Sequence, residues 1–276
     1  MVKKVYGVIG DPIEHSFSPV MHNAAFEALG LDAIYLAFRV AEHELGDAIR
    51  GAKSLGIAGL NVTIPLKEKA LAFVDADDVA TRIGAINTIA FTSGTPTGYN
   101  TDGIGALTVL KEKVGEMRGK EVLILGAGGA ARAIAFYLDA EGARLTIANR
   151  TEDRAAMLAS SLHNAGFISL REEELKRHIR DADILINTTP VGMYPRADAT
   201  LVNAGMMHSE LVVFDIVYNP AETKLLREAK KAGVQTIIEG VKMLVYQGAA
   251  SFRIWTGMEP PVEVMESAVR KALSLS

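Results

Sequence analysis

The sequence contains no cysteine, which excludes disulfide bonds, a thiolate nucleophile and cysteine-ligated metal sites. It also has no apolar run of about 18 residues, the length that a membrane-spanning helix requires. Positive charge is not in excess, because 29 Lys and Arg stand against 33 Asp and Glu, a formal net charge of −4. We therefore expect neither a nucleic acid nor a membrane as a partner.

What the sequence does contain is typical of a folded globular protein. Apolar residues make up 49% and charged residues 22% of the 276 residues, which excludes a largely disordered or fibrous chain. The length predicts one or two domains. Glycine and proline occur too early in the chain for a signal peptide, so a cytoplasmic location is expected.

The first part of the chain alternates strand-like and helix-like segments. Ser18 followed by Pro19 is typical of an N-cap with proline at the first helical position, and Gly30 ends the helix they predict. Pro65 is expected to open another helix, with Lys67 in its first turn. The other segments of this part predict strands at residues 5–9, 33–40, 60–63, 85–91 and 97–99, and a helix at residues 42–55.

From residue 121 onward, strands and helices alternate regularly. This alternation predicts a parallel sheet covered by helices on both faces. The pattern of predicted strands and helices changes between residues 102 and 120, so we expect a domain boundary there. The pattern predicts strands at residues 121–125, 144–148, 184–187, 211–216 and 235–238, and helices at residues 130–141, 152–164, 241–256 and 262–275.

A glycine-rich turn follows the apolar strand at residues 121–125. Gly126 and Gly128 occupy the first two positions of a dinucleotide-binding fingerprint, and Ala131 occupies the third. In this motif the glycines allow a tight turn and the close approach of a pyrophosphate, which binds the free N–H groups of the following helix. The alternative is a glycine-rich turn that serves packing alone.

The end of the next strand indicates which dinucleotide would bind. NAD sites usually carry Asp or Glu about 20 residues after the glycines, where the carboxylate binds the ribose hydroxyls. This chain has Asn149-Arg150-Thr151 there, and Arg154 lies one helical turn beyond Arg150. Arginine presents a planar set of donors to a 2′-phosphate. The sequence therefore favours NADP, unless both arginines are only solvated surface charges.

Polar clusters in the first half lie at predicted element ends, where functional side chains are common. Ser16 and Ser18 either shape a turn and cap a helix or, beside free helix N–H groups, bind a carboxylate. A lysine in a first helical turn is disfavoured by the helix dipole, so Lys67 suggests an acidic partner. Asp102 either caps the helix after it or orients a lysine. The histidines of this half are expected to form local hydrogen bonds rather than a metal site.

In order and spacing, these stretches and several others resemble the shikimate dehydrogenase family over nearly the whole chain. Each motif is short, but their succession is specific. The matching stretches are Ser16-Phe17-Ser18-Pro19, Asn61-Val62-Thr63-Ile64-Pro65-Leu66-Lys67, Gly84-Ala85-Ile86-Asn87-Thr88, Asn100-Thr101-Asp102-Gly103, Gly126-Ala127-Gly128-Gly129-Ala130, Asn149-Arg150-Thr151, Asn187-Thr188-Thr189-Pro190, Val217-Tyr218-Asn219-Pro220, and Gly240 through Met243-Leu244 to Gln247.

The resemblance implies an enzyme that uses NADPH to reduce the ketone of 3-dehydroshikimate to shikimate, reversibly, in the shikimate pathway of aromatic amino-acid biosynthesis. It implies an α/β fold of two domains, a substrate domain with a mixed, mostly parallel sheet at residues 1–102 and a Rossmann-type NADP-binding domain at residues 103–238. Residues 239–276 would form helices that pack back on the substrate domain. The active site would lie in the cleft between the domains, in a monomer or a homodimer.

The family's functional residues carry over position by position. Lys67 resembles the catalytic lysine, with Asp102 as its partner, and a lysine ammonium can stabilise and protonate a ketone oxygen during its reduction. The resemblance implies substrate binding by Ser16 and Ser18 at the carboxylate, and by Asn61, Thr63, Lys67, Asn87, Asp102, Tyr218 and Gln247. It implies NADP binding by Asp78, Gly126, Ala127, Gly128, Gly129, Ala130, Asn149, Arg150, Thr151, Arg154 and Thr188, and by Ile216, Gly240 and Met243 near the nicotinamide. It implies no metal.

Three other functions remain open from the sequence. A dehydrogenase that also acts on quinate with NAD would tend to carry an acidic residue after the second strand, where this chain has Asn149. An S-adenosylmethionine methyltransferase also uses a glycine-rich turn, but it too would have an acidic residue at that position. A non-catalytic nucleotide sensor is disfavoured only through the resemblance, in which Lys67 and Asp102 are kept together.

Overall fold

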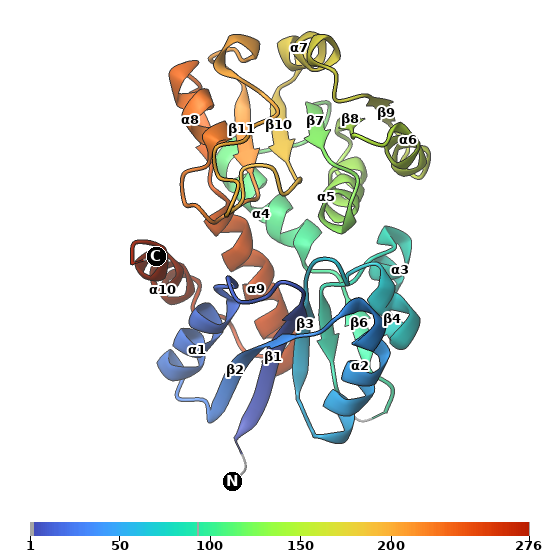
Figure 1. Cartoon of the computed structure of the whole chain (residues 1–276), viewed down its shortest axis with the longest axis vertical. Helices are drawn as coiled ribbons and strands as arrows, with labels where there is room; N and C mark the ends of the chain where they lie inside the picture. Colours follow the sequence, from blue (N-terminus) through green and yellow to red (C-terminus); the bar gives the residue numbers. More distant parts are fainter. Residues whose placement is uncertain (1–2, 93, 276) are drawn as a thin grey trace. The chain divides into compact units, whose positions relative to one another are not determined.

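Two sheets of six strands each form the framework of the structure, a computed structural model that describes residues 3–92 and 94–275. The chain divides into two units, each with one sheet (Figure 1). Unit 1 comprises Met1–Gly105 and Val245–Ser276, and unit 2 comprises Ala106–Leu244. Both boundaries fall inside helices, α4 (Asp102–Val114) and α9 (Gly240–Thr256).

The sheet of unit 1 is mixed, with the strand order β2-β1-β3-β5-β6-β4. β1 pairs in parallel with both β2 and β3, and β4 pairs in parallel with β6. β5 is antiparallel to both of its neighbours, β3 and β6. The strands are β1 Lys4–Gly10, β2 Ala33–Arg39, β3 Gly59–Val62, β4 Asp75–Ala76, β5 Thr88–Ala90 and β6 Thr97–Tyr99.

The helices of unit 1 cover the sheet with apolar faces. In α2, Leu45, Ile49 and Ala52 recur on one helical face, are all buried, and pack in one cluster with Leu60 and Val62 of β3. This packing fixes the strand from which several functional candidates project. The helices are α1 Ser18–Ala28, α2 Leu45–Ser54, α3 Asp78–Ile83 and α10 Val262–Leu273, with 3₁₀ helices η1 Glu42–Glu44 and η2 Lys69–Phe73.

The C-terminal helices belong to unit 1. α10 packs against α1, and Trp255 of α9 donates a hydrogen bond from Nε1 to the carbonyl of Ile89, at 3.0 Å. A side chain at position 59 would clash with the indole ring, so only glycine allows α9 to approach β3 this closely. The predicted return of the C-terminal helices to the first part of the chain is therefore confirmed.

The sheet of unit 2 is parallel throughout, with the order β12-β11-β10-β7-β8-β9. The chain adds β8 and β9 on one side of β7 and then β10, β11 and β12 on the other, as doubly wound dinucleotide-binding folds do. The strands are β7 Glu121–Leu125, β8 Arg144–Ala148, β9 Ala165–Ile168, β10 Ile184–Asn187, β11 Val212–Asp215 and β12 Thr236–Ile238.

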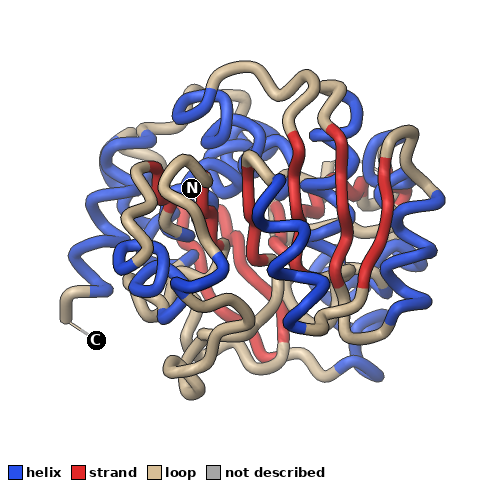
Figure 2. The backbone as a smooth tube through the Cα atoms, turned by 90° about the horizontal axis from the view of Figure 1, so that it is seen from above, coloured by secondary structure: helices blue, strands red, loops and turns tan. Residues whose placement is uncertain are grey.

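Helices lie beside these strands (Figure 2). Leu123, Leu185 and Val213 from neighbouring strands form a buried cluster with Ile179 of α7 and Leu226 of α8. Every residue of β10 is buried, as expected for a central strand covered on both faces. The helices of unit 2 besides α4 and α9 are α5 Gly129–Ala140, α6 Glu152–Ser160, α7 Glu172–Asp181 and α8 Lys224–Lys231, with the 3₁₀ helix η3 Ala204–Met206.

The predicted fold class is confirmed, but several elements were not predicted. The strands at residues 97–99, 121–125, 144–148 and 184–187 have the predicted bounds, and most others differ by a few residues. The elements that the sequence pattern did not predict include β4, β9, α3, α7 and α8. α7 and α8 are short and highly charged and bury only two and three residues respectively, so few apolar residues are present to indicate a helix.

The predicted N-cap of the first helix is wrong. Phe17 is the N-cap residue of α1, and Ser18 is already its first helical residue. Ser16 supplies the nearby hydroxyl instead, because its Oγ accepts a hydrogen bond from the N–H of Ser18 at 3.3 Å. Ser16 thus shapes this turn, which is one of the two roles that the sequence left open for it.

The helix predicted to begin at Pro65 is also wrong. Residues 64–68 form turns and a bend, and the next helical segment is η2. The backbone of this segment bonds to other parts of unit 1, since the Ile64 carbonyl accepts from the N–H of Asp11 and the Lys67 carbonyl accepts from the N–H of Ile86. Lys67 therefore lies in a turn held between two loops.

Candidate active site

Four segments of unit 1 meet at one edge of its sheet. Because β1 and β3 are parallel, with Ile9 beside Val62, the loops after both strands leave from the same edge. Antiparallel β5 begins there, since Thr88 pairs with Asn61 of β3. β6 ends there, since Tyr99 pairs with Thr88. This topology gathers most of the predicted substrate residues.

Lys67 and Asp102 form a shielded ion pair at this edge. The Nζ atom of Lys67 lies 2.6 Å from Oδ2 of Asp102, and the two side chains are 16% and 4% exposed. Charges withheld from water interact more strongly than a surface pair does. Of the two roles that the sequence left open for Asp102, the contact to a lysine is present in the structure.

Asn87 joins this ion pair to a helix from the C-terminal part of the chain. Its buried Nδ2 donates to Oδ1 of Asp102 and to Oγ1 of Thr101, both at 2.9 Å, and lies 3.2 Å from Oε1 of Gln247. Its Oδ1 accepts from the N–H of Thr101 at 2.7 Å. Because every polar atom of this amide has a partner, Asn87 holds Asp102 and Gln247 in fixed positions.

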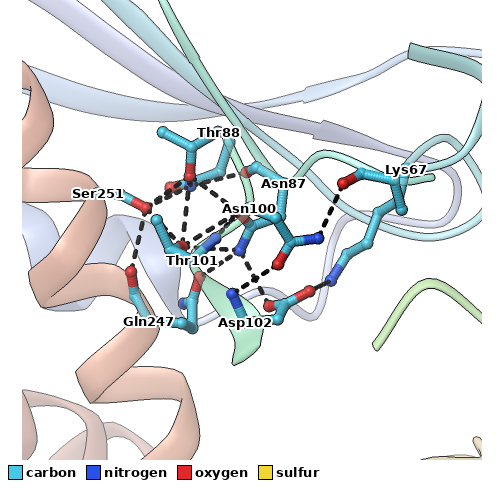
Figure 3. A network of polar contacts seen from close by, with 10 residues as sticks. Lys67, Asn87, Thr88, Asn100, Thr101, Asp102, Gln247 and Ser251 are labelled. Carbon is cyan, nitrogen blue, oxygen red and sulfur yellow. Dashed lines mark hydrogen bonds and ion pairs between the residues drawn. The ribbon is translucent and has the colours of Figure 1, made fainter. Parts of the chain in front are cut away.

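The buried hydroxyl groups of Thr88 and Ser251, which were not predicted as site residues, lie on the side of Asn87 away from Lys67 (Figure 3). Ser251 Oγ lies 2.8 Å from Oγ1 of Thr88 and accepts from Nδ2 of Asn61 at 3.0 Å. The Tyr35 hydroxyl donates to Oδ1 of Asn61 at 2.7 Å. Ser251 follows Gln247 by four residues, so helical spacing would have placed both on one face and could have indicated this contact.

The two serines predicted to bind a carboxylate lie where β1 leads into α1. Ser18 is buried and Ser16 is half-buried. The N-cap residue Phe17 makes no capping hydrogen bond with its side chain. A helix start without such a cap favours an anion beside its N–H groups. Thr63, which follows β3, is half-buried at the same edge of the sheet.

In unit 2 the predicted cofactor residues follow the carboxyl ends of adjacent strands. Leu125 pairs with Ala148 on one side and Asn187 on the other, and Asn187 pairs with Asp215. The chain reverses its direction of winding between β7 and β10, which is where doubly wound sheets bind ligands. One edge of the sheet therefore presents, in order across it, Asn149, Gly126, Thr188 and Ile216.

The glycine turn after β7 has the geometry that a dinucleotide pyrophosphate requires. Gly126 has a φ of +113°, and a Cβ there would lie 2.5 Å from Oγ1 of Thr188. Gly128 is exposed and is the N-cap residue of α5, and among the described residues other than its chain neighbours no atom lies within 4 Å of its Cβ position. The first N–H groups of α5 are therefore open to an anion, and these residues fit the phosphates of NADP.

The residues predicted to select NADP lie at the end of β8 and the start of α6. Arg150 and Arg154 are exposed. Asn149 Nδ2 donates to the carbonyl of Thr151 at 2.9 Å, which fixes the turn before the helix. Thr151 is the N-cap residue of α6, but its hydroxyl makes no capping bond. Two arginines beside an uncapped helix start fit a 2′-phosphate.

Ile216, Gly240 and Met243 lie near one another in unit 2. A Cβ at Gly240 would lie 2.6 Å from the carbonyl oxygen of Ile216, so only glycine fits there. Met243, one turn into α9, is buried. Tyr218, predicted to bind substrate, lies in unit 2, and Asp78, predicted to bind the cofactor, is an exposed residue of α3 in unit 1. Their roles stay predictions.

Comparison with known proteins identifies the family. Three family models match in succession, the shikimate dehydrogenase substrate binding domain at residues 8–89, shikimate / quinate 5-dehydrogenase at residues 108–235 and the shikimate 5′-dehydrogenase C-terminal domain at residues 240–270. A shikimate dehydrogenase (NADP(+)) of Methanosarcina mazei is 55% identical over 99% of both chains. The chain belongs to the shikimate dehydrogenase family. A relative of the same description from Methanococcoides burtonii is also 55% identical, over 99% of this chain and 100% of the relative.

A solved structure has the same fold. The shikimate 5-dehydrogenase of Thermus thermophilus, in complex with NADP(H) and shikimate, superimposes with a TM-score of 0.88 at 39% identity, over 98% of this chain and 99% of that one. The membership favours an NADP-dependent oxidoreductase over the methyltransferase and the non-catalytic sensor. Among the helices of residues 3–92 and 94–275, none combines the length and hydropathy that crossing a bilayer requires.

Proposed function

We propose that this chain catalyses the reversible, NADPH-dependent reduction of 3-dehydroshikimate to shikimate, with Lys67 as the acid and base and Asp102 as the residue that orients it. The observation that carries the catalytic part is the shielded ion pair of these two residues. The reaction supplies a precursor for aromatic amino-acid biosynthesis, in line with the family. The catalytic roles rest on the geometry of unit 1 and on the residue types present there.

Lys67 acts on the ketone oxygen of the substrate. Its ammonium group stabilises the negative charge that develops on this oxygen and donates a proton to it, and the amine accepts the proton back in the reverse reaction. Asp102 limits the positions of Nζ through their 2.6 Å contact. Asn87 in turn holds the carboxylate of Asp102 through Oδ1, so that the lysine is oriented before substrate arrives.

The remaining polar groups of the cluster recognise the substrate. We assign the carboxylate to Ser16 and Ser18, where hydroxyl groups adjoin the start of α1. Gln247 is an amide that can both donate to and accept from substrate hydroxyl groups, and Asn87 orients it through the 3.2 Å contact between Nδ2 and Oε1. Thr63 adds a half-buried hydroxyl at the same edge of the sheet. This arrangement suits a small, polar, carboxylated ring.

Unit 2 provides the cofactor site. The turn of Gly126 to Ala130 would hold the pyrophosphate of NADP, and Arg150 and Arg154 would bind its 2′-phosphate. When bound, NADPH supplies the hydride for the reduction. Thr188, Ile216, Gly240 and Met243 would line the site toward the nicotinamide end. The chain is proposed to act as a monomer or a homodimer, which light scattering would decide.

Steady-state assays test the proposal. The purified chain should reduce NADP with shikimate and oxidise NADPH with 3-dehydroshikimate, both followed by the absorbance of NADPH. Quinate and NAD, tried in all combinations, should give lower kcat/KM values. Turnover with quinate and NAD as efficient as that with shikimate and NADP would contradict the assigned substrate and cofactor. No turnover with any combination would contradict the function altogether.

A further inference from the structure

Asp215, at the end of β11, is a completely buried carboxylate with three hydrogen-bond donors around it. Its Oδ1 accepts from Nδ2 of Asn187 at 2.9 Å and from the N–H of Val217 at 3.1 Å. Its Oδ2 accepts from the hydroxyl of Thr223 at 2.6 Å. The donors come from β10, from the turn after β11 and from the N-cap of α8, elements that lie side by side in Figure 1. All three donors are uncharged.

Through Asn187, this carboxylate fixes the turn after β10. The Oδ1 atom of Asn187 accepts from both the N–H and the hydroxyl of Thr189, at 3.1 and 2.7 Å. Thr188, between them, donates to the carbonyl of Leu125 at 2.6 Å and lies against Gly126 of the glycine turn. The amide of Asn187 is therefore oriented by Asp215 at its nitrogen and by Thr189 at its oxygen. Thr189 belongs to the turn that lies beside the glycine turn.

Through Val217, the same carboxylate fixes the turn after β11. This turn carries Ile216, whose carbonyl oxygen, together with that of Val217, lies against Gly240 at the start of α9. Asp215 thus contacts the turn after β11 directly, and it contacts the turn after β10 through Asn187. Both turns carry residues assigned to the nicotinamide end. It does not itself belong to the residues assigned to NADP.

We propose that Asp215 is a positioning residue for NADP, which in its ionised form holds the turns bearing Thr188 and Ile216 in the geometry that binds the cofactor. This inference rests on the proposed function, because Thr188 and Ile216 are cofactor contacts only there. A carboxylate accepts hydrogen bonds more strongly than a neutral acid does. Loss of its charge should therefore loosen both turns.

The position of Asp215 gives the proposal a measurable signature. Burial raises its pKa to about 6, while the hydrogen bonds from Thr223, Val217 and Asn187 act in the opposite direction. Protonation at Oδ2 would end the hydrogen bond that the Thr223 hydroxyl donates there, since this hydroxyl would have to accept instead. Cofactor affinity should therefore weaken as the pH falls through about 6.

The experiment measures the Kd of NADPH by calorimetry between pH 5 and pH 8 for the wild type and for Asp215→Asn. The amide has the shape of the protonated acid but cannot ionise. At pH 8 the variant should bind NADPH about tenfold more weakly, the order expected for one lost hydrogen bond to a charged group. At pH 5 the two proteins should bind alike. The 2′-phosphate of NADPH also titrates near pH 6. Because the same ligand is used with both proteins, comparing the variant with the wild type cancels this effect.

Two further variants separate positioning from general stability. Asp183→Asn alters an aspartate at the opposite, amino end of β10, which accepts from Lys120 and from the N–H of Glu121, and should leave the Kd unchanged. Thr223→Val removes one donor to the carboxylate, so the midpoint of the pH profile should move to higher pH. This second shift keeps the proposal testable if Asp215→Asn folds poorly.

The outcomes are distinct. A tenfold difference at pH 8 that disappears at pH 5, with the KM for shikimate unchanged, supports the proposal. If Asp215→Asn lowers only the melting temperature and binds NADPH normally at every pH, the positioning role is overturned while the proposed function stands. If the wild type binds no NADPH, the proposed function fails and this inference fails with it.

Discussion

The ammonium group of Lys67 is held by Asp102, whose second carboxylate oxygen is held in turn by the amide of Asn87. Lys67 comes from a turn between strands, and Asp102 is the first residue of a long helix. Neither backbone segment alone would fix the position of Nζ. The orientation of the lysine therefore depends on contacts between segments that are distant in the sequence.

Replacing Lys67 with alanine should lower kcat much more than it raises the KM for shikimate. Proton donation and charge stabilisation act mainly in the transition state, and general acid–base catalysis contributes about 10²- to 10⁴-fold. Steady-state kinetics measures both parameters. Lys69→Ala, a change to an exposed lysine paired with Glu42, is the matched control. A kcat near the wild-type value for Lys67→Ala would remove Lys67 from the mechanism.

Replacing both Ser16 and Ser18 with alanine should weaken the binding of shikimate and leave that of NADPH nearly unchanged. A hydrogen bond to a charged group contributes about 1.5 to 3 kcal/mol, so the KM for shikimate should rise tenfold or more. Calorimetric titration with each ligand measures this, with the exposed Ser54→Ala as control. Lower thermal stability with normal shikimate affinity would mean that the serines only shape the turn.

Replacing both Arg150 and Arg154 with alanine should lower kcat/KM for NADP about 100-fold or more and change that for NAD little. The 2′-phosphate loses its counter-charges, worth about 2.7 kcal/mol at this ratio, while the glycine turn still binds either pyrophosphate. Kinetics with both cofactors measures the preference. The double change of Arg177 and Arg180, exposed on α7, is the control. Equal losses with NADP and NAD would count against these two residues as selectors.

His22 should make the stability of unit 1 depend on pH. The ring is fully buried, is stacked on Tyr35 with centroids 4.4 Å apart, and has no hydrogen-bond partner at either nitrogen among the described residues. The expected local hydrogen bonds are therefore wrong for this histidine. Burial lowers its pKa to about 3, so between pH 6.5 and 3 the unfolded chain binds a proton that the folded chain excludes. Its stabilising contribution is complete above pH 6.5 and falls as the pH drops.

A His22→Phe variant tests this pH dependence, because phenylalanine can occupy the aromatic stack but cannot titrate. From pH 7 to pH 5, the free energy of unfolding of the wild type should fall by about 2 kcal/mol relative to the variant. Comparison with the variant cancels other titrating groups. The fluorescence of Trp255, the one tryptophan in the sequence and part of unit 1, reports the unfolding. The prediction would be contradicted if the wild type and the variant differed in free energy of unfolding by the same amount at pH 7 and at pH 5.

Local sequence patterns predicted most of the fold because its central strands are strongly apolar. β7, β8 and β10 have the predicted bounds. The turn carrying Lys67 could not be predicted locally, because its backbone hydrogen bonds go to Asp11 and Ile86. Such contacts depend on the tertiary structure rather than on propensity.

The candidate site was predicted to a similar extent. The resemblance indicated Lys67, Asp102 and Asn87, and the structure brings them together. It did not indicate Ser251 or Asp215, which are assigned no contact with a ligand and act through other residues. Their roles follow only from hydrogen bonds across unit 1 and unit 2 respectively.

The chain passes from unit 1 to unit 2 inside α4 and returns to unit 1 inside α9, and this has a consequence for synthesis on the ribosome. Unit 2 is a single continuous segment, whereas unit 1 needs both ends of the chain. As the protein emerges, unit 2 can fold first, but the sheet of unit 1 must wait for Trp255 to cover β3 and for α10 to reach α1. A fragment that ended at Leu244 would contain every strand of the parallel sheet but only part of unit 1, so the apolar strands of unit 1 would be available to chaperones.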